Sequence, residues 1–154
     1  MKTSEIQPIV IIDSREQLPY SFDFPSVKAA LPVGDYSLQG LESVFAIERK
    51  SLSDLIGCLT HDRARFLREI ERGSNLKTLY LLIEASLADI EAGKYRSKIN
   101  PESVIGSLLA WVARFRNFKP IFAGNRNSAQ KLAGKILRRE GLEAVNSNEQ
   151  EPEF

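Results

Sequence analysis

Three charged residues are spaced in a way that could support hydrolysis of a phosphodiester bond. Asp35 follows a glycine at the start of one expected strand, and Glu48 and Lys50 lie two residues apart on the next expected strand. Residues two apart in a strand share a face, so the lysine would lie beside the glutamate. Two converging carboxylates can hold a metal ion, and the lysine can orient the attacking water or neutralise developing charge. The pattern favours metal-assisted hydrolysis.

Two more acids follow a run of β-branched apolar residues. The run covers residues 9–12 and predicts a strand that is buried on both faces. Asp13 and Glu16 come directly after it, although Asp13 could equally cap the turn that follows. Acids at the ends of buried strands are costly unless they face a cleft or form pairs. We therefore expect both side chains near the same site.

Alternating strands and helices must position these residues, which predicts an α/β fold. Residues 34–38 and 43–50 should form a hairpin that turns at Gly40. On its second strand, Glu48 and Lys50 share one face, and Arg49 points to the other. Ser51 should cap the next helix. We expect further strands at 78–83 and 119–123, and a helix at 62–71 that ends at Gly73. Another helix should begin at 100–102, with an apolar face of Ile105, Leu108, Leu109 and Val112. A last helix should begin at 127 or 128.

Composition narrows the class of protein. The 154 residues suit one domain, and 43% hydrophobic with 27% charged residues is typical of a globular protein. No apolar run approaches the roughly 20 residues of a membrane span, and the N-terminal residues do not resemble a signal peptide, so we expect an intracellular protein without membrane partners. The net charge is only +1. Attraction to DNA would therefore have to come from a local basic patch.

A single cysteine and a single histidine limit the metal chemistry. Cys58 has no intrachain partner for a disulfide, and together with His61 it cannot form a Cys/His zinc site. A site made from protein ligands alone would rest on carboxylates, which favour Mg²⁺ or Mn²⁺. We expect Cys58 in the core and His61 at the surface.

The segment around these residues resembles a known family. Gly34-Asp35, followed after a gap by residues 48–54 (Glu-Arg-Lys-Ser-Leu-Ser-Asp), is similar to the signature of the XPF/MUS81 nucleases, which carry an ERCC4-type nuclease domain. Residues 11–16 resemble that family's first strand, and residues 63–66 its basic segment. The resemblance extends from about residue 9 to residue 137.

The resemblance implies a restriction-endonuclease-like core, with a central mixed sheet flanked by helices, that cuts DNA near branches or flaps. It makes Asp35 and Glu48 the metal ligands and Lys50 the catalytic lysine, with 5′ phosphate products. Asp13 and Glu16 become supporting catalytic acids, and Asp13 a further candidate metal ligand. Arg49 and Asp54 complete the catalytic motif. Arg49 could instead pair with a structural acid such as Asp54. Asp54 could also simply cap its helix.

Domain boundaries and partners follow from the same resemblance. Residues 1–145 are predicted as the nuclease domain and 146–154 as a disordered acidic tail. Relatives usually carry a helix-hairpin-helix pair, for which this sequence leaves no room, so we expect a stand-alone phage- or bacterial-like domain. A homodimer or a partner subunit is expected. The candidate DNA contacts are Arg15, Arg63, Arg65, Arg68 and Lys98. Arg63, Arg65 and Arg68, with Arg72, could alternatively form a solvated helix face.

Two rival functions differ in class or in substrate. The chain could be a catalytically silent DNA-binding or scaffold subunit, as occurs in the family when motif acids are lost. The presence of Asp35, Glu48 and Lys50 argues against that reading. Alternatively, a resolvase-type or phage nuclease would keep the chemistry and act on another DNA substrate.

Overall fold

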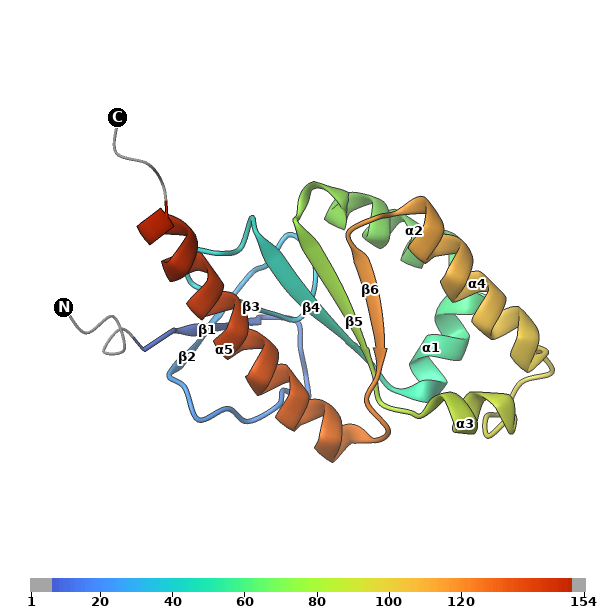
Figure 1. Ribbon diagram of the computed structural model, residues 1–154. Helices are drawn as coiled ribbons and strands as arrows, with labels where there is room; N and C mark the ends of the chain where they lie inside the picture. Colours follow the sequence, from blue (N-terminus) through green and yellow to red (C-terminus); the bar gives the residue numbers. More distant parts are fainter. Residues whose placement is uncertain (1–6, 151–154) are drawn as a thin grey trace.

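Six strands form one mixed sheet at the centre of the protein (Figure 1). The computed structural model describes residues 7–150. The strand order is β2-β1-β3-β4-β5-β6. Strand β3 pairs antiparallel with β1 and with β4, whereas the pairs β1–β2, β4–β5 and β5–β6 are parallel. The strands are β1 (Val10–Asp13), β2 (Ser26–Ala29), β3 (Tyr36–Leu38), β4 (Phe45–Lys50), β5 (Thr78–Ile83) and β6 (Phe118–Phe122).

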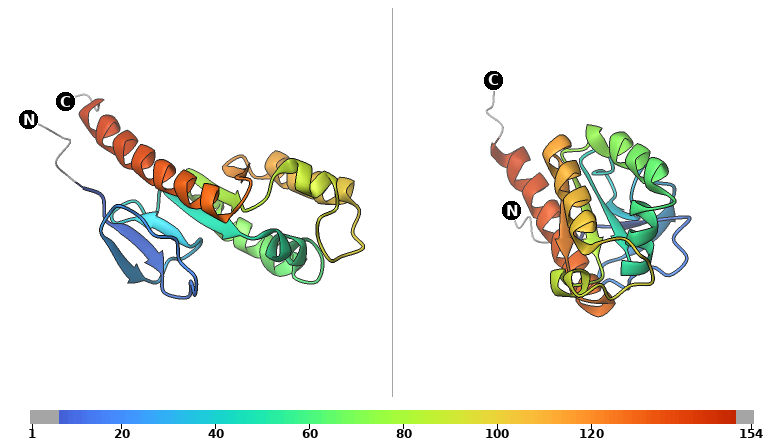
Figure 2. Two further views of the ribbon diagram at one scale, coloured as in Figure 1. Left: turned by 90° about the horizontal axis from the view of Figure 1, so that it is seen from below. Right: turned by 90° about the vertical axis from the view of Figure 1, so that its right-hand side faces the viewer.

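Helices cover both faces of this sheet (Figure 2). On one face, α1 (Leu52–Leu59), α2 (Arg63–Arg72) and α4 (Pro101–Arg114) bury their apolar side chains in a single core cluster with β4 and β5. The short α3 (Leu87–Glu91) adds Ile90 to that cluster, and the 3-10 turn η2 (Gly73–Asn75) follows α2. On the other face, α5 (Arg126–Gln150) packs Ala129, Ala133 and Leu137 against a second cluster.

Most of the expected elements are present, for the reasons that predicted them. The hairpin forms between β3 and β4, with Gly40 in a positive-φ turn. Ser51 caps α1, because its Oγ accepts from the Asp54 N–H at 3.1 Å. Asn100 caps α4 in the same manner, ahead of Pro101, and Gly73 ends α2. The predicted mixed sheet flanked by helices is confirmed.

Some local expectations were wrong or incomplete. Strand β2 was not predicted, because all four of its residues are exposed and show no apolar pattern. Leu109 was expected on the apolar face of α4 but is 61% exposed, and Val104 and Trp111 are buried with Leu108 instead. Helix α5 continues to Gln150, so residues 146–150 are helical, although we expected a disordered tail from 146. Residues 151–154 lie outside the described residues.

The two core clusters meet across the sheet at β4 and β5. Ala46 and Leu81 belong to the cluster under α1, α2 and α4, whereas Ile47 and Leu82 belong to the cluster under α5. Within residues 7–150, no helix is both long enough and apolar enough to cross a membrane. Since β4 is a central strand, the charged residues at its carboxyl end are delivered to both faces of a rigid sheet.

Candidate active site

Gly34 places Asp35 between two strands. Its φ is +83°, a region that L side chains rarely adopt, and a Cβ at this position would lie 2.8 Å from the Ala46 Cβ. This close approach lets the Asp35 N–H donate to the Ile47 carbonyl at 2.8 Å. The Asp13 N–H donates in turn to the Asp35 carbonyl at 2.8 Å. The Gly-Asp step is therefore a backbone junction that ties β1 to β4 at the site.

Asp35, Glu48 and Lys50 come together as the sequence predicted. One carboxylate oxygen of Asp35 accepts from the Arg49 N–H at 2.7 Å, which fixes Asp35 against the end of β4. Lys50 Nζ lies 3.2 Å from a carboxylate oxygen of Glu48, and both side chains are mostly buried. The same ammonium lies 5.5 Å from the centre of the Phe66 ring on α2. Glu48 and Lys50 thus face the α2 side of the sheet.

The two carboxylates carry negative charge that the protein only partly neutralises. Burial raises the pKa of Asp35 well above its usual range, and Glu16 and Asp13 raise it further. The hydrogen bond from the Arg49 N–H and the charge of Lys50 lower it by less. Burial and then Asp35 itself raise the pKa of Glu48, against Lys50. For Lys50, burial lowers the pKa, but the neighbouring Glu48 outweighs it and the net shift is upwards. The acids repel each other, while the lysine stays protonated.

The donor set fits a hard divalent cation. Among residues 7–150, no three His, Cys, Asp or Glu side chains gather closely enough to enclose a metal ion. Mg²⁺ does not require such a cage, because it commonly uses one or two carboxylates and completes its shell with water and phosphate oxygens. Asp35 and Glu48 supply two oxygen donors whose mutual repulsion a divalent ion would relieve.

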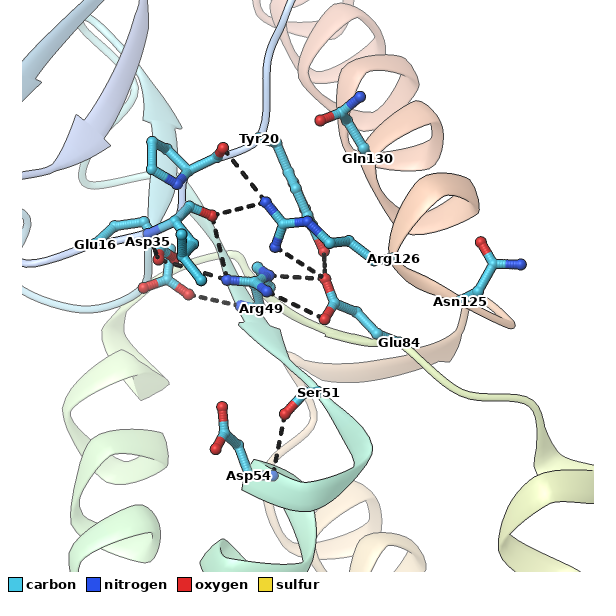
Figure 3. Close-up of polar contacts among 12 residues, drawn as sticks. Glu16, Tyr20, Asp35, Arg49, Ser51, Asp54, Glu84, Asn125, Arg126 and Gln130 are labelled. Carbon is cyan, nitrogen blue, oxygen red and sulfur yellow. Dashed lines mark hydrogen bonds and ion pairs between the residues drawn. The ribbon is translucent and has the colours of Figure 1, made fainter. Parts of the chain in front are cut away.

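The opposite face of β4 holds a different charge cluster, drawn in Figure 3. Arg49 makes a two-pronged contact with Glu84, with Nε 2.7 Å from one oxygen and a terminal nitrogen 3.2 Å from the other. Its other terminal nitrogen lies 3.5 Å from Glu16. The Tyr20 hydroxyl donates to Glu84, and the Arg126 guanidinium lies 3.9 Å from it. We call Arg49, Glu84, Glu16, Tyr20 and Arg126 the Arg49 cluster.

Charge is balanced within the Arg49 cluster. Burial raises the pKa of Glu84, but hydrogen bonds from Arg49 and Tyr20 outweigh it, so the pKa lies below its usual range. Burial lowers the pKa of Arg49, and its bonds to Glu84 more than reverse that shift. The guanidinium carbons of Arg49 and Arg126 lie 5.2 and 5.1 Å from the centre of the Tyr20 ring. The cluster therefore connects the carboxyl ends of β4 and β5 to the segment around Tyr20 and to the start of α5.

Asp13 is buried next to the acid pair, and both of its oxygens are occupied. Arg15 binds them through Nε at 2.9 Å and a terminal nitrogen at 3.2 Å, and the Leu31 N–H donates to one at 2.8 Å. Burial raises the pKa of Asp13, but these donors outweigh it and the net pKa is lowered. Arg15 itself is largely exposed and also binds the Leu31 carbonyl at 2.9 Å. Asp13 therefore holds Arg15 and the 29–31 loop near the acids.

A polar cleft opens beside Lys50, between α1 and α2. It has a volume of about 410 Å³, and its lining includes Asp54, His61, Arg65 and Glu69. Ser53 lines both this cleft and a second one of about 390 Å³, which also contains Lys94 and Arg96. Of the predicted basic contacts, Arg65 lies in the first cleft, and Arg68 and Lys98 are exposed elsewhere. The first cleft therefore holds charges of both signs, and the second adds two basic side chains next to it.

Arg63 has a structural environment instead. Its guanidinium lies 5.0 Å from the centre of the Trp111 ring and donates to the Ser107 hydroxyl at 3.0 Å. These contacts fasten α2 to α4. His61 is 77% exposed at the side chain, and Cys58 is buried, as expected.

The sequence reasoning missed three residues of the Arg49 cluster, namely Tyr20, Glu84 and Arg126. The suggested pairing of Arg49 with Asp54 is wrong, because the side chain turns toward β5 and binds Glu84. A signal for Glu84 was present: it follows the buried strand β5, just as Asp13 follows β1. The same rule on acids after buried strands would have selected it. Tyr20 and Arg126 carry no comparable signal, since they meet Glu84 only in the fold.

Known proteins share this fold and a sequence family with the chain. The ERCC4 domain family matches the sequence over residues 12–135, which is most of the chain. The chain belongs to the ERCC4 domain family. The matched range contains Asp35, Glu48 and Lys50 as well as the Arg49 cluster, so both faces of β4 fall within the family domain.

Two solved structures of XPF from Aeropyrum pernix have a similar fold. XPF from Aeropyrum pernix superposes with a TM-score of 0.67 and 17% identity, covering 92% of this chain and 69% of that one. XPF from Aeropyrum pernix in complex with DNA gives a TM-score of 0.64 and 18% identity, covering 96% and 69%. No curated protein matches the chain in sequence. The restriction-endonuclease-like core that we predicted is thereby confirmed, and this ERCC4 domain has the XPF nuclease fold.

Proposed function

We propose that this ERCC4 domain is a metal-dependent DNA endonuclease that hydrolyses phosphodiester bonds. The observation that carries the proposal is the pair Asp35 and Glu48, two mostly buried carboxylates with raised pKa values beside the protonated Lys50. A structural ion pair would balance its own charge, as the Arg49 cluster does. An acid pair that the protein leaves unbalanced suits a cation that arrives with the substrate.

Each residue of this site has a distinct part in the proposed reaction. Asp35 and Glu48 would hold the ion, which ERCC4 nucleases generally use and which supplies Lewis acidity and an activated water when bound. Lys50, kept protonated by Glu48, would donate to the scissile phosphate and stabilise its added negative charge. Asp13 would keep Arg15 close to the acids, where its guanidinium can contact a phosphate. Glu16 helps to anchor Arg49.

DNA as the substrate is supported by two observations. One solved relative of the same fold is described as XPF in complex with DNA. In this chain, the cleft beside Lys50 carries Arg65, and the neighbouring cleft carries Lys94 and Arg96; these side chains can bind a phosphate backbone. We further propose Mg²⁺, with Mn²⁺ as a substitute, as the ion, and branched or flapped DNA as the preferred substrate. Association as a homodimer or with a partner subunit belongs to the same proposal.

Cleavage of end-labelled DNA tests the proposed function. Forked, flapped, four-way and plain duplex DNA are incubated with the protein in Mg²⁺, in Mn²⁺ and in chelator. We expect cutting only with metal, and a loss of at least about 100-fold in Asp35→Asn and in Lys50→Ala. Lys77→Ala serves as the control, because Lys77 is exposed before the start of β5, away from the acids. Light scattering on the same samples reports the oligomeric state.

The outcome also decides between the rival functions. Equal cutting by wild type and Asp35→Asn would trace the activity to a contaminant and end the nuclease proposal. DNA binding without cutting in either metal would support the silent DNA-binding or scaffold subunit. If cutting is metal-dependent but favours four-way or plain duplex DNA over forks and flaps, the chemistry stands and the resolvase-type or phage reading replaces the branch preference.

A further inference from the structure

The first half of α5 carries an unusual concentration of positive charge. Residues 126–139 contain five lysines and arginines and no acid, whereas the whole chain has 21 basic against 20 acidic residues. Three of the five, Lys131, Lys135 and Arg138, are spaced four and three residues apart, so they lie along one face of the helix. All three are exposed. Within residues 7–150, no carboxylate lies within ion-pair distance of them.

This basic face forms one wall of a groove. The opposite wall is the 21–24 segment, which is tied to α5 because the Ser21 N–H donates to the Gln130 side chain at 3.0 Å. The groove has a volume of about 360 Å³, and Phe22 and Phe24 contribute apolar surface to it. The Arg138 guanidinium lies 5.2 Å from the centre of the Phe24 ring, so the two form a stacked platform. We call this the α5 groove.

The groove lies close to the Arg49 cluster but not inside the acid site. Arg126, at the start of α5, donates to the Leu18 carbonyl at 2.9 Å and lies 3.9 Å from Glu84. Gln130, one turn further along α5 (Figure 3), is one of the residues that line the groove. Helix α5 covers the sheet face opposite to Glu48 and Lys50. DNA that occupies the groove would therefore pass around the carboxyl ends of β4 and β5 to reach the acids.

The chemistry of the groove selects one class of ligand. A solvated surface helix normally mixes charges of both signs, and this face does not. Cations in a row suit the phosphates of a nucleic acid, and aromatic surface beside them suits unpaired bases. A duplex keeps its bases paired and stacked, so it would offer the groove its phosphates but no free base for the aromatic surface. We propose that the α5 groove binds a single-stranded segment of DNA next to the cleavage site, an inference that rests on the proposed function.

Equilibrium binding in chelator tests the groove without requiring catalysis. The full chain is titrated with labelled oligo(dT) and with a duplex of equal length, over a range of salt concentrations. The triple variant Lys131→Ala/Lys135→Ala/Arg138→Ala should bind oligo(dT) at least about 10-fold more weakly. Its salt slope should fall by about 2, since each lost single-strand phosphate contact contributes about 0.7. Duplex binding should change much less.

Two further variants separate a specific groove from general charge. Arg72→Ala/Lys77→Ala/Arg116→Ala removes the same charge from exposed positions elsewhere and should bind oligo(dT) nearly as the wild type does. Phe24→Leu keeps an apolar side chain but removes the ring, and should weaken oligo(dT) binding by about fivefold at an unchanged salt slope. Equal losses in both triple variants, an equal loss for duplex, or wild-type affinity in the groove variant would each overturn the proposal.

The outcomes for groove and nuclease can be told apart. Metal-dependent cutting by wild type, together with unchanged oligo(dT) binding in the groove variant, would remove the groove proposal and leave the nuclease intact. If the protein binds oligo(dT) through the α5 groove but never cuts DNA, the groove proposal stands and the nuclease proposal is overturned. A wild-type chain that does not bind oligo(dT) at all would overturn the groove proposal by itself.

Discussion

The two faces of β4 both carry clusters of charged side chains, but the charges are balanced on only one of them. On the α2 side, Asp35 and Glu48 repel each other, and their pKa values rise. On the α5 side, Glu84 is bound by Arg49 and Tyr20, and its pKa falls. Both sets are mostly buried, and they meet at the end of β4, where Glu48, Arg49 and Lys50 are consecutive residues. Burial alone therefore does not distinguish a chemical site from a structural one, whereas the balance of charge does.

The two faces are joined by one backbone group. The Arg49 side chain belongs to the balanced cluster, while its N–H donates to Asp35 in the unbalanced pair at 2.7 Å. The cluster thus supplies a fixed point against which the Asp35 carboxylate is held. Removing an acid from the balanced face should damage the fold, and removing one from the unbalanced face should damage only the chemistry.

Replacing Glu84 tests this contrast with the largest expected effect on stability. Glu84→Ala would leave the mostly buried guanidinium of Arg49 with only Glu16 as an acidic partner. Breaking such a pair costs about 3–5 kcal/mol of the free energy of unfolding. Urea denaturation followed by circular dichroism measures the loss. Asp35→Asn is the matched change on the other face and should leave the free energy of unfolding unchanged or higher, because it relieves the repulsion with Glu48 while Lys50 keeps Glu48 as its partner and the amide oxygen can still accept from the Arg49 N–H. Equal losses in the two variants would remove the distinction between the faces.

Gly34→Ala tests whether the Gly-Asp junction needs its glycine. The substitution combines a positive φ with a Cβ placed 2.8 Å from the Ala46 Cβ, so we expect a loss of about 2–5 kcal/mol in the free energy of unfolding. Gly40→Ala is the control: its φ is +89°, but an added Cβ meets nothing within 4 Å. It should cost only about 1–2 kcal/mol. If Gly34→Ala is as stable as Gly40→Ala, β4 can shift near Ala46 to accommodate the added Cβ.

The pH dependence of stability sharpens the comparison further. Asp35 and Glu48 have raised pKa values, so the folded protein without metal binds more protons than the unfolded chain does. Their contribution to stability is therefore largest below the ordinary carboxyl pKa of about 4 and is lost as pH rises through the raised values. Glu84 and Asp13, with lowered pKa values, act in the opposite sense.

Thermal melts at several pH values measure this effect. The increase in Tm on adding Mn²⁺ should grow as pH rises, because the ion replaces the lost protons between the two acids. In the double variant Asp35→Asn/Glu48→Gln, the increase should vanish at every pH. An increase that is the same at low and high pH would mean that the ion binds elsewhere.

Two neighbouring arginines of α2 give the smallest contrast. Arg65 lines the cleft beside Lys50, whereas Arg63 stacks on Trp111 and bonds to Ser107. We expect Arg65→Ala to weaken DNA binding severalfold at unchanged stability. Arg63→Ala should instead lower the free energy of unfolding by about 0.5–1 kcal/mol, with a smaller effect on binding. Fluorescence anisotropy in chelator, together with urea melts, separates the two. If the two variants show the same changes in DNA binding and in stability, both side chains contribute only general surface charge.

Local sequence patterns were sufficient for most of the elements and for placing Glu48 and Lys50 on one face of a strand. Alternation along 45–50 put Glu48 and Lys50 on one side, and the capping preferences of Ser51 and Asn100 located two helix starts. These features depend on neighbours in the chain. Gly34 likewise marked the turn into β3, although its close contact with Ala46 is visible only in the fold.

The Arg49 cluster could not be predicted in the same way, because it depends on the order of the strands. Glu84 reaches Arg49 since β5 pairs in parallel with β4, with Arg49 opposite Leu82. Tyr20 and Arg126 arrive from segments far away in sequence. Strand β2 was hidden for another reason: its pairing with β1 is made by the backbone, and its side chains remain exposed. The periodicity of a segment can be read from neighbouring residues, but the position of a strand within the sheet cannot.

Direct titration with Mn²⁺ tests the central claim that the unbalanced face of β4 is a metal site. Isothermal calorimetry compares the wild type with Glu48→Gln and with Glu91→Gln, which changes an exposed acid at the end of α3. We predict that wild type and Glu91→Gln bind Mn²⁺ alike and that Glu48→Gln binds at least about 10-fold more weakly. Unchanged affinity in Glu48→Gln would contradict the account, because the acid pair would then not be what holds the ion.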